Sequence, residues 1–171
     1  AYNAKGDVIL TVYGNGIMNR QLYDNKTFFL KHTRTSSFIQ TGWTFEDNSG
    51  VKEDKIFDFD LEGNIVQTND QCSDCGLPAT PNELTRNFSY DPLYRLANAT
   101  GRESDTQSSS VIWGDPPITQ TPNAQNSRSY TQVFEYDKLG NILKKMHSSS
   151  GNNYTRRYNY QNGKNTLIDI D

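Results

Sequence analysis

Short aromatic and apolar stretches alternate with turn-forming residues along the chain, and the stretch that begins FEYDKLGNIL at Phe134 shows the pattern most completely. Phe134 and Tyr136 are two residues apart, so in an extended strand they point to the same face. Asp137 can bind nearby backbone N–H groups with its carboxylate and so start a turn. Gly140 and Asn141 tolerate the positive φ at which a chain reverses. The apolar pair that follows predicts a returning strand, and the whole stretch predicts a β-hairpin.

Imperfect copies of this hairpin pattern occur from one end of the sequence to the other. The aromatic residue that opens each copy stands at positions 2, 23, 59, 90, 136 and 160. This uneven spacing favours a long sheet with loop insertions over a solenoid or propeller of equal repeats. The residues that we expect to form the turns, with the aromatic residues beside them, are Tyr23, Asp24, Phe59, Asp60, Gly63, Asn64, Tyr90, Asp91, Tyr136, Asp137, Gly140 and Asn141.

The remaining stretches fit the same all-β architecture. Between Lys31 and Asp47 the aromatic residues alternate as they do in a strand, around a kink at Gly42. Two polar stretches, near residues 67–86 and 103–128, are expected to be long loops. No stretch of helical length shows a clean helical period. We therefore predict a single antiparallel β region over residues 1–171.

The composition predicts a thin core. Hydrophobic residues make up 33% of the 171 residues and aromatic residues 12%. When Gly is counted in place of Tyr, the apolar share is about 34%, below the roughly 45–50% of typical globular proteins. Tyr suits a strand with one wet face. Such a chain fits a sheet that is one layer of something larger, and we expect it to be a fragment of a longer protein whose neighbouring strands cover its edges.

The charge pattern disfavours two classes of partner. The net charge is -3, and Lys and Arg are scattered, whereas a nucleic-acid groove normally shows a basic patch. The longest apolar runs, such as the one from Val8 to Leu10, are far too short for a membrane span or the core of a signal peptide. If the protein is exported, its signal is expected outside this chain, or export uses another route.

Cys72 and Cys75 form one Cys-x-x-Cys pair. A redox site of this type needs a helix that follows a strand, but Pro78 and Pro81 indicate a loop. A zinc site needs about four ligands, and the chain offers only two histidines to complete it. We therefore favour a loop pair that is left as thiols or closed as a local disulfide, and we assign no metal or cofactor.

No arrangement typical of an enzyme appears. Asp58 and Asp60 share a strand face, but Asp60 is already needed by a turn. His32 and His147 are far apart in sequence, and no Ser/His/Asp order or phosphate loop accompanies them. The glycines from Gly14 onward begin a G-x-G-x-x-G pattern that is incomplete. We assign no catalytic residue.

The ordered motifs resemble the RHS/YD-repeat family, whose unit is Tyr-Asp, two variable residues, Gly-Asn or Gly-Arg, then Leu or Ile. The longer motifs are YNAKGDVILTVYGNG at Tyr2, YDPLYRLANATGRE at Tyr90, YDKLGNILKKMH at Tyr136 and TRRYNY at Thr155. They resemble one subgroup in particular, the shell-forming B and C components of bacterial insecticidal toxin complexes and related Rhs toxins. The resemblance runs, with gaps, from end to end of the chain.

For a chain of this kind the resemblance implies a curved β-strip that forms part of a hollow shell around a toxin domain. It implies a secreted or cell-surface bacterial protein, and its partners would be neighbouring shell repeats, a partner shell subunit and the enclosed toxin. No catalytic residue of that family carries over to this chain. The alternative is an adhesion module that binds glycan or protein, as in the teneurin-like receptors that share the repeat, with Trp43, Trp113 or Tyr154 stacking on sugars. An enzyme is the third hypothesis.

Overall fold

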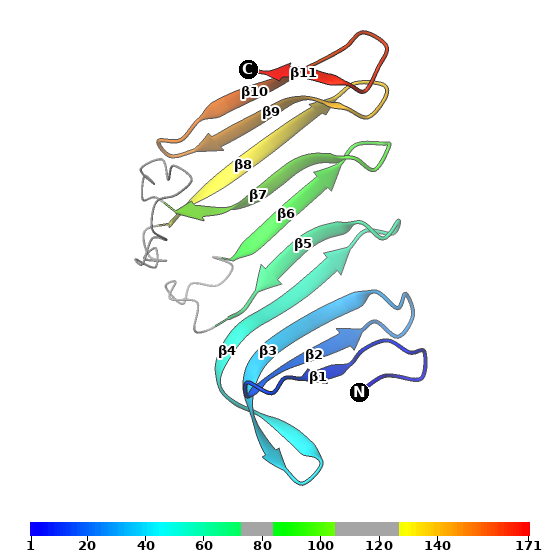
Figure 1. Ribbon diagram of the computed structural model, residues 1–171, viewed down its shortest axis with the longest axis vertical. Coiled ribbons are helices and arrows are strands. Elements are labelled where there is room, and N and C mark those ends of the chain that lie inside the picture. The colour runs from blue at the N-terminus through cyan, green and yellow to red at the C-terminus, as the bar shows by residue number, and fades with distance from the viewer. Residues whose placement is uncertain (73–83, 105–126) are drawn as a thin grey trace. The chain divides into compact units, whose positions relative to one another are not determined.

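The computed structural model describes residues 1–72, 84–104 and 127–171, and within these ranges the regular structure consists of eleven β-strands (Figure 1). The strand pairings described below, β1 to β5 and β6 to β11, are antiparallel. The chain divides into two compact units, unit 1 over Ala1–Thr85 and unit 2 over Arg86–Asp171. The predicted all-β fold of antiparallel hairpins is confirmed.

Unit 1 is an open meander of five strands, in which each strand pairs with the next along the chain. These strands are β1 (Leu10–Val12), β2 (Ile17–Tyr23), β3 (Leu30–Thr41), β4 (Thr44–Phe59) and β5 (Ile65–Asp70). A bridge between Tyr2 and Val8 adds a small N-terminal hairpin. Since β3 and β4 are much longer than their neighbours, their hairpin extends beyond the rest of the unit (Figure 1).

Unit 2 continues with the same architecture. Its strands are β6 (Thr85–Tyr90, which starts at the boundary), β7 (Leu96–Ser104), β8 (Ser127–Tyr136), β9 (Ile142–Ser149), β10 (Tyr154–Tyr160) and β11 (Leu167–Ile170). Neighbours in this list pair in sequence order, from β6 with β7 to β10 with β11. The curvature of a continuous strip through both units stays a prediction.

The strands extend into both stretches that the sequence suggested were long loops. β5 continues to Asp70 and β7 to Ser104, and β6 and β8 begin before each stretch ends. The rest of these stretches, residues 73–83 and 105–126, lies outside the described residues, and with them Cys75 and Trp113.

The kink expected at Gly42 is wrong, because the chain reverses there. Thr41 pairs with Thr44, so Gly42 and Trp43 form a two-residue hairpin loop. Gly42 has a φ of 63°, which the first position of such a loop requires and which Gly adopts without steric cost. The alternation of aromatic residues was real, but it runs along two strands instead of one.

The core of the described residues is thin. The buried apolar side chains in these ranges are those of Met18, Cys72 and Ala99. Buried polar side chains, Thr33, Ser36, Asp54 and His147, are at least as numerous. A sheet with one layer has no second layer to bury its faces, so polar contacts between strands are a large part of what holds each unit together.

Candidate functional site

The expected turn residues lie in a row at one end of the strands in each unit, which we call the turn edge (Figure 1). At β8–β9, Asp137 Oδ1 accepts the backbone N–H groups of Leu139 and Asn141, both at 2.8 Å. The Asn141 side chain donates to Asp137 Oδ2 at 2.8 Å. Asp60 binds Glu62 and Asn64 in the same way at β4–β5. Each carboxylate thus supplies the acceptors for its own reversal.

Other turns vary this arrangement. At β6–β7, Asp91 Oδ1 accepts the N–H groups of Leu93 and Arg95 at 2.9 and 3.0 Å, and the Arg95 side chain replaces the asparagine on Oδ2 at 2.7 Å. At β2–β3 the turn is one residue longer, and Asp24 Oδ1 accepts from Lys26 and Thr27 at 2.8 Å. The pattern therefore tolerates changes in the partner and in the loop length.

The residue two positions before the returning strand has a left-handed backbone in these turns. Gly63 and Gly140 have φ values of 93° and 91°, whereas the corresponding residue at β6–β7 is Tyr94, with a φ of 60°. Asn141, which the sequence suggested as a second positive-φ residue, is not one of the residues with positive φ. Its part in the turn is the side-chain hydrogen bond to Asp137.

These contacts lower the pKa of each turn carboxylate. The Asn141 side chain is the largest cause for Asp137, and the Asn64 side chain has the same effect on Asp60. Asp91 and Asp24 have lowered pKa values chiefly because backbone N–H groups donate to them. Hydrogen bonds to the charged form favour that form, so the four carboxylates are ionised at neutral pH.

The aromatic residues that precede the turns pack along the strands. Tyr136 donates its hydroxyl to the Leu96 carbonyl at 2.8 Å, and burial raises the pKa of this phenol. The Phe59 ring lies 4.9 Å from the Phe29 ring. Tyr23 donates to the Gln21 side chain at 2.8 Å, and Tyr90 ends β6 half-buried.

Neighbouring turns also contact one another within a unit. Arg95 Nη1 donates to the Asp137 carbonyl at 2.8 Å, and Asn141 donates to Asn165 at 3.0 Å in the next turn. In unit 1, the Lys5 ammonium lies over the Phe28 ring. Within each unit, these contacts join neighbouring turns to one another.

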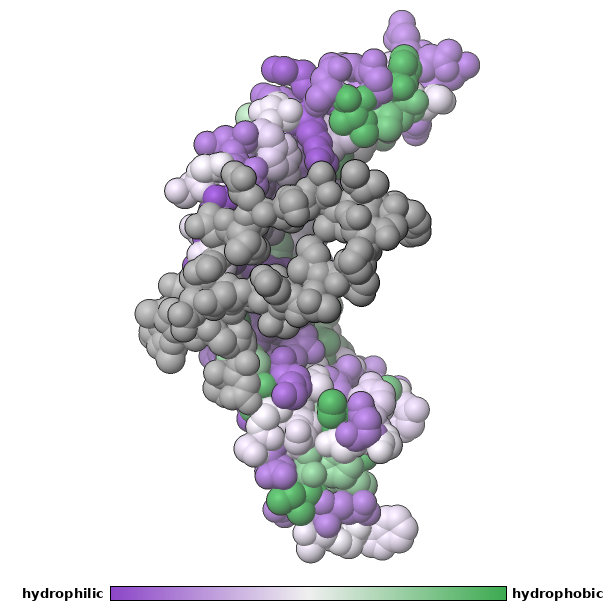
Figure 2. Space-filling view, turned by 60° about the vertical axis from the view of Figure 1, so that its left-hand side comes forward, coloured by the Kyte–Doolittle hydropathy of each residue, from purple (hydrophilic) through white to green (hydrophobic). Residues whose placement is uncertain are grey.

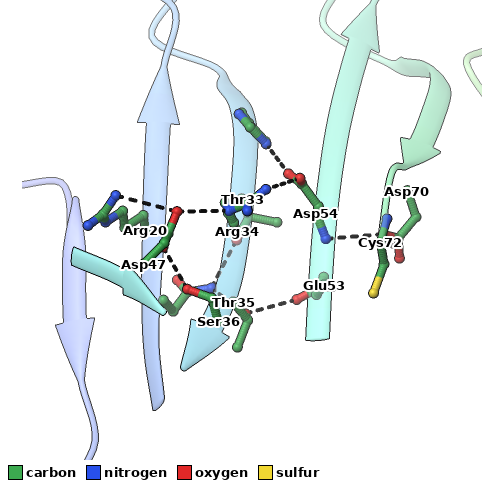
Figure 3. Close-up of polar contacts among 12 residues, drawn as sticks. Arg20, Thr33, Arg34, Thr35, Ser36, Asp47, Glu53, Asp54, Asp70 and Cys72 are labelled. Atoms are coloured by element: carbon green, nitrogen blue, oxygen red, sulfur yellow. Dashed lines mark hydrogen bonds and ion pairs between the residues drawn. The ribbon is translucent and has the colours of Figure 1, made fainter. Parts of the chain in front are cut away.

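A first polar cluster lies at the base of the long β3–β4 hairpin (Figure 3). Asp54, which is buried, accepts a hydrogen bond from Arg34 and lies 2.5 Å from His32 Nε2. Asp47 accepts from Arg34 Nε at 3.2 Å and from the buried Ser36 hydroxyl at 2.7 Å. The Ser36 hydroxyl therefore contacts a carboxylate and no histidine, so these residues form no Ser/His/Asp relay.

A second polar cluster joins four strands of unit 2 and contains His147, which is 3% exposed. The imidazole stacks on the Tyr154 ring at 4.7 Å and lies 5.1 Å from the Tyr130 ring. Its Nδ1 lies 3.2 Å from the Gln132 amide. Its Nε2 is 3.0 Å from Glu103 Oε2 but is not aligned for a hydrogen bond. The histidine is packed like a core residue.

Glu103 is held by the groups around it. Burial alone raises the pKa of this carboxyl, but hydrogen bonds from Arg128 and Asn152, with the charge of His147, lower it to about 2. Arg128 donates to Glu103 at 2.8 Å across the β7–β8 pair. Sequence reasoning missed this cluster because its members come from separate strands.

Tyr154 is not open for sugar stacking in the way the sequence suggested. Its ring stacks on His147, and the Arg156 guanidinium lies 5.2 Å from its centre. Trp43 is 96% exposed. Cys72 is buried, with its Sγ 3.2 Å from the Val51 carbonyl oxygen.

Neither a metal centre nor a membrane-spanning helix is found in the described residues. No group of three or more His, Cys, Asp or Glu side chains among them is placed to hold a metal ion. No helix in the described part of the chain has the length and apolar character needed to cross a membrane.

Comparison with known proteins gives relatives but no family model that matches. Toxin subunit YenC2 of Yersinia entomophaga is 26% identical over 160 residues, and toxin subunit YenC1 of the same organism is 28% identical over 159 residues. Each match covers 90% of this chain and 16% of the relative. The chain thus spans a small part of the length of the curated relatives it matches.

Comparison with solved structures also finds proteins of toxin complexes. The crystal structures of TcdB2-TccC3-Cdc42 and TcdB2-TccC3 match with TM-scores of 0.76 and 0.75 at 26% identity. Both matches cover 98% of this chain and 8% of the solved chain. The resemblance to subunits of bacterial toxin complexes, which the repeat motifs indicated, is confirmed.

Proposed function

We propose that this chain is a wall segment of a β-sheet shell that encloses a toxin domain in a secreted bacterial toxin complex. The observation that supports it most is the similarity to toxin subunits over 90% of the chain, in a match that spans 16% of each relative. A structural role in a toxin complex follows from that similarity. Enclosure of a toxin domain is the further step that needs an experiment.

The physical character of the sheet supports this role. Apolar turn residues face water, with Leu61 101%, Leu93 66% and Leu139 62% exposed. An open sheet with apolar residues on its surface and unpaired outer strands is prone to association. Neighbouring repeats in a longer shell would cover such edges. We propose these repeats, or a partner shell subunit, as the contacts of this segment, with the enclosed toxin domain as its cargo.

We propose that the segment contributes architecture and no catalysis. The groups that resemble enzyme components have structural partners: His32 contacts Asp54, and Ser36 donates to Asp47. The turn carboxylates bind their own turns. We propose that the segment acts outside the cell, as part of a secreted complex in which these polar contacts hold its strands together.

Two measurements test the proposal. The intact mass of the native protein is expected to lie far above 19.4 kDa, the mass of this chain. Limited proteolysis of that native protein should then leave an enclosed domain uncut, and mild denaturation should make the same domain sensitive. A native mass of 19.4 kDa, or a cargo domain that is cut as fast before denaturation as after it, would overturn the proposed function.

A further inference from the structure

The outer part of the β3–β4 hairpin, residues 38–48, leaves the sheet of unit 1; we call it the arm. The pairing of β2 with β3 ends at Ser37, and the pairing of β5 with β4 begins at Lys55. Beyond these points the two strands pair with each other alone, down to Thr41 and Thr44. The arm is therefore a two-stranded ribbon attached to the sheet at its base.

The arm has a fixed direction. Register shifts between Thr35 and Ser37, with a φ of 90° at Gly50, mark a bulge that bends β4 where the arm begins. Arg20 of β2 then donates to the Phe45 carbonyl at 2.5 Å and lies 3.8 Å from Asp47. These contacts draw the arm across the face of β2 that carries Arg20 (Figure 3).

The arm continues past the outermost strand of unit 1. In Figure 1 its end lies beyond β1, on the side of the unit away from β5. There the loop presents Trp43, which is 96% exposed, and Ile39 on the neighbouring strand is 53% exposed. Figure 2 shows hydrophobic and near-neutral side chains together at this end of unit 1.

The ribbon behind the tip has its own internal contacts. Gly42 sets a tight two-residue loop, and Phe38 packs edge-to-face against Phe45 with ring centres 5.3 Å apart. A Trp side chain has only two χ angles to fix when it binds, and Trp is among the residue types enriched at interface positions that dominate binding energy. A Trp held in water by a braced ribbon therefore indicates a contact surface.

We propose that the arm is a strap, and that Trp43 docks on strands that precede β1 in the parent shell. This inference rests on the proposed function and names the partner of the arm. The docking surface is the face of that sheet that continues the face of Met18 and Arg20 in this unit. The length of the relatives supports this occupant, because each match covers 16% of the relative and leaves most of its length outside this chain.

The direction of the arm selects this occupant over others. The arm crosses β2, and its end points past β1 (Figure 1), so a strand that extends the sheet at β1 would lie on the side toward which the arm points. An antiparallel strand added there would sit about 5 Å from β1, within reach of an indole ring that overhangs the edge. An arm that reached a separate protein or a glycan would more naturally point away from the sheet of unit 1. This arm instead runs along that sheet, which favours a contact with further strands of the same chain.

Hydroxyl-radical footprinting of the native parent protein, read by mass spectrometry, tests the strap. Reaction rates at Trp43 and at Tyr94, which is 61% exposed, are each divided by the rate in urea-unfolded protein. We expect Trp43 to be protected at least tenfold, with Tyr94 as the exposed reference. A Trp43 rate equal to the unfolded rate would overturn the docking, as would protection that appears only when glycans are added.

A substitution gives a second measurement. Trp43→Ser in the parent protein should speed protease cleavage within the arm several-fold, while Trp43→Phe should recover most of the protection. An arm that is cut at the same rate in the unchanged protein and in Trp43→Ser would overturn the strap. The two proposals can fail separately. A native mass of 19.4 kDa would overturn the proposed function. A much longer native protein in which Trp43 reacts as fast as in the unfolded state would overturn only the docking of the arm.

Discussion

The turns and the strands between them are held together in different ways. At the turn edge, each carboxylate binds groups within four residues of itself, as Asp137 binds Leu139 and Asn141. Away from the turn edge, side chains from distant parts of the sequence meet: Arg34 and Asp54 are 20 residues apart, and Asn152 and Glu103 are 49 apart. Local contacts build the turn edge, and the folded sheet builds the polar clusters.

The two polar clusters also differ in which side chain is buried. Both combine a carboxylate, an arginine and a histidine, but the carboxylate is the more buried group in unit 1 and the histidine in unit 2. In unit 1 the Asp54 side chain is 9% exposed and that of His32 is 32% exposed. In unit 2 the His147 side chain is 2% exposed and that of Glu103 is 21% exposed. Burial decides which substitution leaves a void or an unpaired group, so similar chemistry should give different mutational costs.

The largest effect is expected at His147. His147→Ala removes a buried ring from between Tyr130 and Tyr154 and should lower the free energy of unfolding by about 3 kcal/mol. His32→Ala, the matched change in unit 1, should cost about 1 kcal/mol or less because water reaches that side chain. Urea unfolding of both variants measures the difference.

The comparison fails if the two histidine variants lose equal stability. In that case the packing of His147 between the aromatic rings would add nothing to its polar contacts. His147→Phe serves as a control, since it keeps the stacked ring and removes both nitrogen atoms. It should recover part of the loss, because ring stacking is worth about 1 kcal/mol beyond burial.

A smaller effect is expected where Asp47 joins the arm to the sheet. Asp47→Ala leaves the buried Ser36 hydroxyl without its acceptor and removes a partner of Arg34. The expected loss is about 1–2 kcal/mol of unfolding free energy. Because the arm crosses the face of β2 that carries Met18, which is 0% exposed, its release should also expose that thioether.

Peroxide oxidation followed by peptide mass mapping measures this release. Met18 in Asp47→Ala should oxidise several-fold faster than in the unchanged chain. Met146, in unit 2, is the internal control and should oxidise at the same rate in both proteins. Equal rates at Met18 would mean that the arm is held by other contacts.

The sequence predicted the part of the fold that local chemistry determines. A Tyr-Asp pair, two spacers and a Gly-Asn pair specify strand, turn and strand within ten residues, so the fold class followed directly. The β3–β4 loop was missed because Gly42-Trp43 lacks the Asn or Asp that usually marks a tight turn. The polar clusters had no local signal at all, since Glu103 and His147 meet only after three strands have paired.

Acid should weaken the second polar cluster, which contains Glu103. The pKa of Glu103 is lowered from 4.5 to about 2, so between these values the unfolded chain binds more protons than the folded chain. The stabilisation from Glu103 is thus complete above pH 4.5 and is lost as pH falls toward 2. Glu103→Gln should reduce the loss of stability over that range by about 1 kcal/mol, after allowance for solvent screening.

Urea unfolding at a series of pH values between 6 and 2 tests this on the unchanged chain and the Gln variant. The turn carboxylates also have lowered pKa values and contribute to acid sensitivity in both proteins, so the difference between the two curves isolates Glu103. Parallel curves would show that Glu103 carries no extra acid sensitivity.

The smallest effects are expected at the turn edge, where two positions with the same backbone carry different residues. Gly140 has a φ of 91° and Tyr94 a φ of 60°. Gly140→Ala should cost about 1 kcal/mol because a Cβ is disfavoured in the left-handed region. Tyr94→Gly should stabilise by about 0.5 kcal/mol, since the strain it relieves exceeds the added freedom of the unfolded chain.

Tyr94→Ala separates backbone from side chain in this last comparison. The alanine keeps a Cβ at positive φ and removes the ring, which is 61% exposed and has little packing to lose. Its stability should therefore stay close to that of the unchanged chain, below that of Tyr94→Gly. If both variants stabilise equally, exposure of the ring, and not the backbone, was the unfavourable feature. The β6–β7 turn would then accept a non-glycine residue without strain. The hydrogen bond from the Arg95 side chain to Asp91 would hold this turn closed as firmly as the bond from Asn141 to Asp137 holds the β8–β9 turn.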